Sequence, residues 1–157
     1  MKKIIKENLS GKIEIKEVPL PSLKSKHLLV RNLYSGISIG TERATVKIAK
    51  KNLLEKAQSR PSDLKKVIKV AKDEGLLAAY GKAMQRLELP TPIGYSSVGI
   101  IEEVPEDVKD FKKGDIVSCA GSGHSEFILV PINLCAKVPH DVRLQEASLV
   151  TIASISL

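Results

Sequence analysis

The stretch Ile93–Pro131, IGYSSVGIIEEVPEDVKDFKKGDIVSCAGSGHSEFILVP, decides the fold of this chain. It contains three short apolar runs, which are separated first by an acidic turn with the segment FKKGD and then by a Gly-rich corner. Short strands that alternate with Gly and Pro turns favour a barrel-like β-domain. We therefore predict three consecutive strands, over Ile100–Val104, Ile116–Ala120 and Glu126–Val130.

The β-pattern continues on both sides of this stretch, but residues 44–89 have a different period. Further strands are predicted over Lys2–Lys6, Lys12–Val18, Leu28–Tyr34 and Leu134–Val138. Within 44–89, apolar residues recur at helical spacing in three runs, of which the second begins at Pro61 and the third at Leu76. The first run consists of Val46, Ala49, Leu53, Leu54 and Ala57.

These periods together predict a mainly β, α+β domain over residues 1–157. Its partly open β-barrel receives a helical insertion of about three helices, and a C-terminal linking helix occupies residues 143–157. That helix is apolar and has no charged residue from Ala147 onward. In a self-sufficient domain it should fold back on the barrel, whereas in an incomplete one it should be exposed or packed on another copy.

The charge, the apolar content and the cysteines limit the classes of protein to which the chain can belong. The chain has 157 residues, 43% of them apolar, and a formal charge of +7. Six of those charges come from the segment Thr41–Leu89, where twelve Lys or Arg residues face six Asp or Glu. No run approaches the roughly 20 apolar residues of a membrane span, and we expect a cytoplasmic protein. Because a reducing compartment keeps thiols reduced, Cys119 and Cys135 are predicted to be free buried thiols.

Several segments carry a resemblance to a known family. The order strand, FKKGD, strand, Gly-rich corner, strand is similar to the GroES-like catalytic domain of medium-chain dehydrogenases/reductases, which include the zinc-type alcohol dehydrogenases. The loop in Leu28–Glu42, LLVRNLYSGISIGTE, matches a loop of that domain. The segments TERATV, KKNLLEKA, DEGLLAAY and PIGYSSVG resemble a zinc-free branch, related to bacteriochlorophyllide dehydrogenase and to dehydrogenases of polysaccharide gene clusters.

The resemblance implies an NAD(P)-dependent oxidoreductase that transfers hydride between alcohols and carbonyls. It also implies that residues 143–157 lead toward a nucleotide-binding Rossmann domain. The chain contains no G-x-G-x-x-G motif after a strand, so we predict that it does not retain NAD(P) alone and is inactive alone. The expected partner is that missing domain or a separately encoded subunit; a homo-oligomer through the apolar C-terminal helix is the other possibility.

The same resemblance implies that zinc is absent. At the three places that match the family's catalytic zinc ligands, the chain has Ser38, Tyr95 and, approximately, Ile152. Zinc is held by thiolate, imidazole or carboxylate donors, and these side chains offer none of them. We therefore predict no metal site.

Without zinc, hydrogen-bond donors and a proton source would assist carbonyl reduction. The catalytic candidates are Tyr95 and Ser38, which the resemblance implies, together with Glu42, which follows the loop glycine and could relay a proton, and His124, whose imidazole in the Gly-rich corner would suit proton transfer. Those implied for substrate binding are Ser96 and Thr41, and those for cofactor binding are Thr41 and Ser156. Three of these catalytic candidates have a simpler interpretation: Tyr95 fills space at the barrel edge, Glu42 interacts with a helix dipole, and His124 is a solvated turn residue.

A different class of function stays open. In this alternative the barrel is a scaffold, and the basic helical insertion binds an anionic ligand or partner. Nucleic acid is not the expected partner, because only 3% of the residues are aromatic and stacking platforms are few.

Overall fold

The computed structural model describes residues 1–49, 55, 61–121 and 123–156, and these form two compact units. The first unit comprises Met1–Ile4, Ile15–Ile39 and Pro92–Leu157. The second comprises Ile5–Glu14 and Gly40–Thr91.

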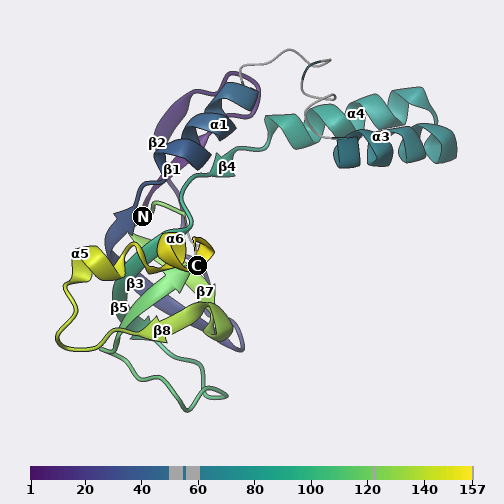
Figure 1. The fold of residues 1–157 in the computed structure, drawn as a ribbon. Coiled ribbons are helices and arrows are strands. Elements are labelled where there is room, and N and C mark those ends of the chain that lie inside the picture. Colours follow the sequence, from purple (N-terminus) through teal and green to yellow (C-terminus); the bar gives the residue numbers. More distant parts are fainter. Residues whose placement is uncertain (50–54, 56–60, 122, 157) are drawn as a thin grey trace. The chain divides into compact units, whose positions relative to one another are not determined.

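The first unit is built on a five-stranded antiparallel sheet with the order β7-β3-β5-β6-β8, which curls into a partly open barrel (Figure 1). Its strands are β3 (His27–Gly36), β5 (Ser96–Glu103), β6 (Ile116–Ala120), β7 (Phe127–Pro131) and β8 (Cys135–Lys137). A short 3-10 helix, η1 (Ile132–Leu134), joins β7 to β8. The mainly β fold predicted from the sequence is confirmed.

A second sheet has the order β2-β1-β4. Its strands are β1 (Lys2–Lys6), β2 (Ile13–Glu17) and β4 (Thr91–Pro92). Both N-terminal strands lie within the ranges predicted for them, Lys2–Lys6 and Lys12–Val18.

The core of the first unit follows from the period of two in the strands. Alternate residues of a strand point to the same face of its sheet, and the buried apolar side chains have this spacing. The cluster consists of Leu28, Val30, Ile101, Val108, Val117, Cys119, Ile128 and Val130. Aliphatic side chains form nearly all of it, as the scarcity of aromatic residues requires.

The second unit contains the helical insertion. Its described helices are α1 (Ile39–Ala49), which belongs to this unit from Gly40 onward, α3 (Pro61–Glu74) and α4 (Leu76–Glu88). Gly75, at a φ of 93°, separates α3 from α4, and Lys82 of α4 pairs with Glu74 at 2.6 Å. Of the first predicted run, Leu53, Leu54 and Ala57 lie outside the described residues.

The C-terminal segment differs from the single helix that its composition predicted. It forms two short helices, α5 (Leu144–Ala147) and α6 (Val150–Ile155), with Ser148 and Leu149 between them. Ala147 and Ser148 are buried against the sheet, at 1% and 5% exposure. Leu149, Val150 and Ile155 are exposed, so the segment folds back on the barrel while part of its apolar surface stays open.

Gly99 allows β3 and β5 to approach each other closely. A Cβ atom at this position would lie 2.3 Å from the carbonyl oxygen of Arg31 and 2.6 Å from a methyl group of Val30. The β3–β5 register shifts between Asn32 and Tyr34, next to this contact. The shift in register and the close approach at Gly99 therefore occur at the same place in the sheet, where a glycine commonly accompanies a bulge.

The FKKGD turn between β5 and β6 is closed by Asp115. Its carboxylate accepts a hydrogen bond from the Lys112 N–H at 3.1 Å and pairs with Lys137 of β8 at 2.9 Å. The hydrogen bond with Lys137 is the main reason why the pKa of Asp115 is lowered; the Lys112 N–H acts in the same direction, and partial burial opposes both. Gly114 supplies the positive φ, 89°, that the turn needs.

Replacing Gly99 by Ala should destabilise the protein by about 2 kcal/mol or more, because the added methyl group meets main-chain atoms that cannot move without breaking the ladder. The free energy of unfolding in urea measures this loss. Gly81→Ala is the matched control, since a Cβ there meets nothing within 4 Å. In the interior of α4 that change should stabilise by roughly 0.5–1 kcal/mol. Equal stability of Gly99→Ala and wild type would contradict the close contact.

The lowered pKa of Asp115 predicts a pH dependence of stability. A depressed carboxyl pKa contributes stability above the unfolded-state value, about 4 for Asp, and the contribution disappears as pH falls through the folded-state pKa. The difference in unfolding free energy between wild type and Asp115→Asn should therefore be largest near neutral pH and should shrink on acidification. A difference that stays constant from pH 7 to pH 3 would show that the carboxylate is not stabilised here.

Candidate functional site

The pairing of β3 with β5 brings the three zinc-matching positions to one end of the sheet. Gly36, near which β3 ends, lies opposite Ser96, where β5 begins. Ser38 follows Gly36 by two residues, and Tyr95 immediately precedes Ser96. Ile152 of α6 packs onto the same place, because its Cδ1 would lie 3.2 Å from a Cβ at Gly36.

His124 belongs to the same end of the sheet. Its N–H donates to the carbonyl of Ile93 at 2.7 Å, and its ring lies against Gly94, where an added Cβ would be 2.8 Å from Nε2. Gly94 also has a φ of 95°, so only glycine fits both the backbone and the ring. At 8% exposure, His124 is nearly buried, and its interpretation as a solvated turn residue was wrong.

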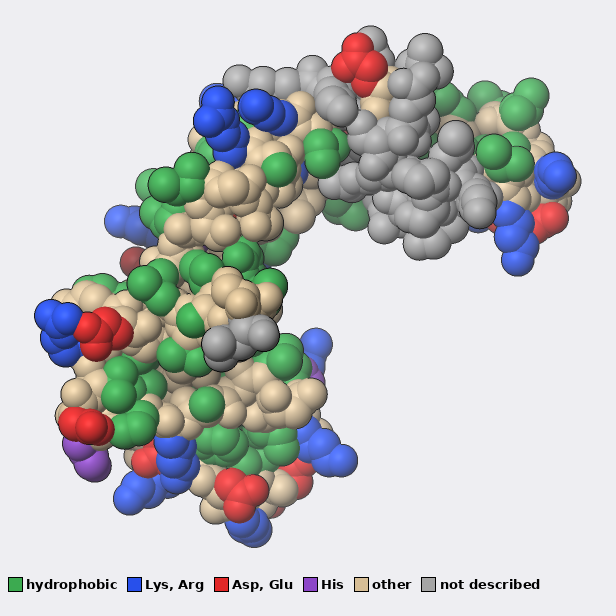
Figure 2. Space-filling view, in the orientation of Figure 1, with side chains coloured by type: hydrophobic (Ala, Val, Ile, Leu, Met, Phe, Trp, Pro, Cys, Tyr) green, Lys and Arg blue, Asp and Glu red, His purple; other side chains and the backbone are tan. Residues whose placement is uncertain are grey.

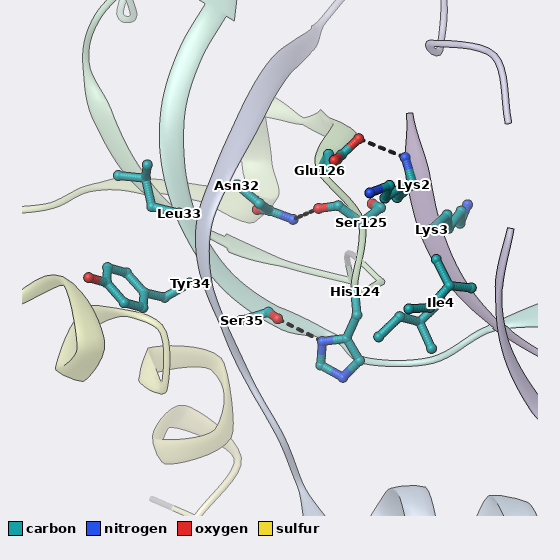
Figure 3. Close-up of a pocket in the computed structure, with 11 residues that line it drawn as sticks. Lys2, Lys3, Ile4, Asn32, Leu33, Tyr34, Ser35, His124, Ser125 and Glu126 are labelled. Atoms are coloured by element: carbon teal, nitrogen blue, oxygen red, sulfur yellow. Dashed lines mark hydrogen bonds between the residues drawn. The ribbon is translucent and has the colours of Figure 1, made fainter. Parts of the chain in front are cut away.

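The His124 ring is oriented by Ser35, whose Oγ lies 2.8 Å from Nδ1 (Figure 3). Beside this pair is a shallow cavity of about 320 Å³ between the end of β3, residues 124–126 and β1. Asn32 borders it and donates from its amide to the carbonyl of Ser125 at 2.7 Å. The other amide atom, Oδ1, is buried without a hydrogen-bond partner among the described residues. Sequence reasoning identified His124 but missed Ser35 and Asn32.

Buried hydroxyl groups fasten the terminal helices to the sheet. Ser96, with no exposed surface, donates to the carbonyl of Ser148 at 2.6 Å. Ser118 of β6, which sequence reasoning also missed, donates to the carbonyl of Ala147 at 2.9 Å. Thr151 adds a longer bond to the carbonyl of Cys119, 3.4 Å. The Ser96 hydroxyl thus has a structural bond, and its predicted contact with substrate remains a prediction.

The remaining candidates lie at helix ends. Ser156 follows α6, and its hydroxyl donates to the carbonyl of Ile152 at 3.3 Å. Thr41 and Glu42 lie in the first turn of α1, in the second unit. A carboxylate in that position interacts favourably with the helix dipole; the catalytic and binding roles of these residues stay predictions.

Within the described parts of the chain, no three His, Cys, Asp or Glu side chains gather in a way that could hold a metal ion. In those same parts, no helix has both the length and the apolar character needed to cross a membrane.

The curled sheet, with its helices, has the GroES-like fold. It resembles a Rhizobium etli protein assigned as a zinc-dependent alcohol dehydrogenase, with a TM-score of 0.64 and 21% identity over 99% of this chain and 38% of that one. Escherichia coli quinone oxidoreductase, crystallised with NADPH, gives a TM-score of 0.62 and 16% identity over 94% of this chain and 36% of that one. At these identities the likeness concerns the fold.

Sequence comparison identifies the family. Residues 54–140, more than half of the chain, match the family described as "Alcohol dehydrogenase GroES-like domain", and the chain belongs to that family. A zinc-type alcohol dehydrogenase-like protein of Staphylococcus aureus (strain COL) is 31% identical over 71 residues, which are 42% of this chain and 21% of that protein. The corresponding protein of Staphylococcus epidermidis is 30% identical over 66 residues, 39% and 20% of the two chains. The match thus spans about a fifth of the length of these curated relatives.

Removing either buried hydroxyl should loosen the terminal helices. Ser96→Ala and Ser118→Ala each leave a buried carbonyl without its donor, a change that costs about 1–3 kcal/mol. Hydrogen exchange of the amides in residues 147–155 should become faster in both variants. Ser154→Ala, which removes a bond from an exposed hydroxyl to Thr151 within the helix, should change exchange much less. Exchange as slow as in wild type after both core substitutions would contradict the anchoring role.

Proposed function

We propose that this chain is the substrate-side domain of an NAD(P)-dependent oxidoreductase that reduces carbonyl groups without zinc. Family membership supports the oxidoreductase class. The observation that carries the proposal is the gathering of Ser38, Tyr95 and Ile152 at one end of the β3–β5 pair, as the register and the Gly36 contact place them.

The chemistry of these three side chains supports the absence of zinc. A hydroxyl, a phenol and an alkyl group do not supply the thiolate, imidazole or carboxylate donors that zinc requires. The nearby His124 is one imidazole, and its Nδ1 already bonds with Ser35. These residues do not fit a catalytic zinc, although the curated relatives are named zinc-type proteins.

In place of a metal, neutral donors would stabilise the oxygen of the carbonyl being reduced. We assign Tyr95 as the main hydrogen-bond donor and proton source, with Ser38 as a second donor. His124, held by Ser35 and packed against the glycine that precedes Tyr95, would assist as a proton carrier. A nicotinamide cofactor would supply the hydride.

We further propose that a nucleotide-binding domain holds the cofactor, on the same polypeptide or on a partner subunit. The sequence lacks a G-x-G-x-x-G motif, and a fold neighbour was crystallised with NADPH. The exposed apolar side chains of Leu149, Val150 and Ile155 offer a surface for that domain. Figure 2 shows hydrophobic side chains gathered on the surface around α6.

The alternative of an anion-binding module has less support. The family is one of alcohol dehydrogenase-like domains, and in the second unit Lys82 is already paired with Glu74. We therefore assign the enzyme role and expect the basic helices to be mainly a solvated surface.

The proposal is tested by assaying the chain together with the nucleotide-binding domain encoded in the continuing or adjacent reading frame. With NADH or NADPH and a panel of quinones, aldehydes and ketones, Tyr95→Phe should lower kcat by roughly 10²–10⁴-fold, because it removes a proton donor. Tyr80→Phe, which alters an exposed tyrosine of α4, is the matched control and should leave kcat unchanged.

Two further results would contradict the proposal. The first is one tightly bound zinc ion per chain in elemental analysis, with activity that chelation removes and zinc restores. The second is low-micromolar binding of NAD(P)H to this chain alone in a calorimetric titration, since we assign the cofactor to another domain.

A further inference from the structure

The two cysteines face each other across neighbouring strands. Cys119 of β6 is the direct partner of Cys135 of β8 in the antiparallel ladder, and their Sγ atoms are 3.9 Å apart. Directly opposed residues in such a ladder have Cα atoms about 4.5–5.5 Å apart, which lies within the range that a disulfide spans. Side-chain rotation is thus enough to bring the sulfurs into bonding distance.

The two thiols differ in the way that disulfide exchange requires. Cys119 is 1% exposed, whereas Cys135 lies on the edge strand of the sheet and is partly exposed. The hydrogen bond between the two thiols lowers the pKa of Cys135, against the opposing effect of burial, and raises the pKa of Cys119, which burial raises further. In disulfide exchange the thiolate is the attacking group, and a lower pKa and greater exposure favour this role. Cys135 therefore suits the attack on an external disulfide, and the buried Cys119 suits the second step.

We propose that Cys119 and Cys135 form a thiol–disulfide exchange site for small-molecule disulfides of the glutathione type. The Cys135 thiolate attacks one sulfur of the small disulfide, forming a mixed disulfide and releasing one small thiol. The Cys119 sulfur then attacks Cys135 Sγ and breaks its bond to the second small thiol, which leaves with the proton that Cys119 gives up, and a Cys119–Cys135 disulfide remains. Both protein thiols are oxidised by two electrons in total, and the small disulfide is reduced to two thiols.

The position of this bond gives it a structural consequence. The strand β8 pairs with β6 through only three residue pairs, and the disulfide would join the two covalently. The carbonyl of Cys119 accepts the Thr151 bond, and the adjacent Ser118 holds Ala147. Oxidation would therefore stiffen the part of the sheet on which α5 and α6 are anchored. This site does not depend on the proposed hydride transfer, and its test involves none.

The first test compares the exchange equilibrium in the folded and the unfolded protein. The full chain is equilibrated with mixtures of reduced and oxidised glutathione, in buffer and in urea, and the remaining thiols are alkylated and counted by mass spectrometry. A ring of about 15 residues closed in a compatible fold should make the folded constant roughly a hundredfold larger. The oxidised protein should also melt about 5–10 °C higher. A folded constant no larger than the one in urea would overturn the proposal.

Two variants separate the roles of the thiols. Cys119→Ala leaves the attacking thiol without its neighbour and should accumulate the mixed disulfide with one glutathione. Cys135→Ala leaves only the buried thiol and should stay unmodified until the protein is unfolded. The reverse pattern, or a stable mixed disulfide in wild type, would show that the pair does not react as we propose.

Hydrogen exchange tests the structural consequence. In the oxidised wild-type chain, amides of residues 147–155 should exchange more slowly than in the reduced chain. Unchanged exchange there would overturn the link between the disulfide and the terminal helices.

Discussion

The antiparallel pairing of β3 with β5 determines where the candidate residues of the first unit lie. It depends on the missing side chain of Gly99, which lets main-chain atoms of Arg31 approach. Once that pairing is set, Gly36 lies opposite Ser96. The loop that follows β3 and the residue that precedes β5 then lie at the same end of the sheet. A shift of one residue would turn every side chain of the strand to the opposite face. The geometry of the candidate site is therefore a consequence of sheet register.

The strands and helices were predictable where one face of each element is apolar. A short apolar run marks β6 and β7, and a period near 3.6 between Pro and Gly boundaries marks α3 and α4. The start of β5 was predicted four residues late, because Ser96 and Ser97 are polar yet have no exposed surface. A polar residue is normally expected to face solvent. Ser96 is instead buried and forms a hydrogen bond with the carbonyl of Ser148, which is distant in the sequence.

The candidate site was predictable only where its residues could be recognised from the local sequence. Tyr95 and Ser38 came from the resemblance of short segments to a known family, which needs no knowledge of packing. His124 was placed at a corner, where a solvated side chain was the simpler interpretation. Its burial depends on the contact of its ring with Gly94. A sequence does not show that these two residues are in contact. Ser118 is one polar residue in an apolar strand, and its acceptor lies 29 residues further along the chain. Such pairs require the register of the sheet.

The break between α5 and α6 follows from the same hydroxyl groups. Helices of four and six residues are too short to be stable in isolation, so their position must come from packing and hydrogen bonds. The last carbonyls of a helix have no partner within it, and those of Ala147 and Ser148 find donors in Ser118 and Ser96. A carbonyl that accepts a hydrogen bond from the sheet is drawn away from the next turn of its helix. The C-terminal segment could form one apolar helix, but it bends at Ala147 and Ser148, where Ser118 and Ser96 supply donors. Directional bonds at two adjacent carbonyls just before α6, together with the bond from Thr151 of α6 to the carbonyl of Cys119, restrict the rotation of this helix more than apolar contact alone would. The exposed apolar side chains of α6 are thereby held in one orientation relative to the sheet.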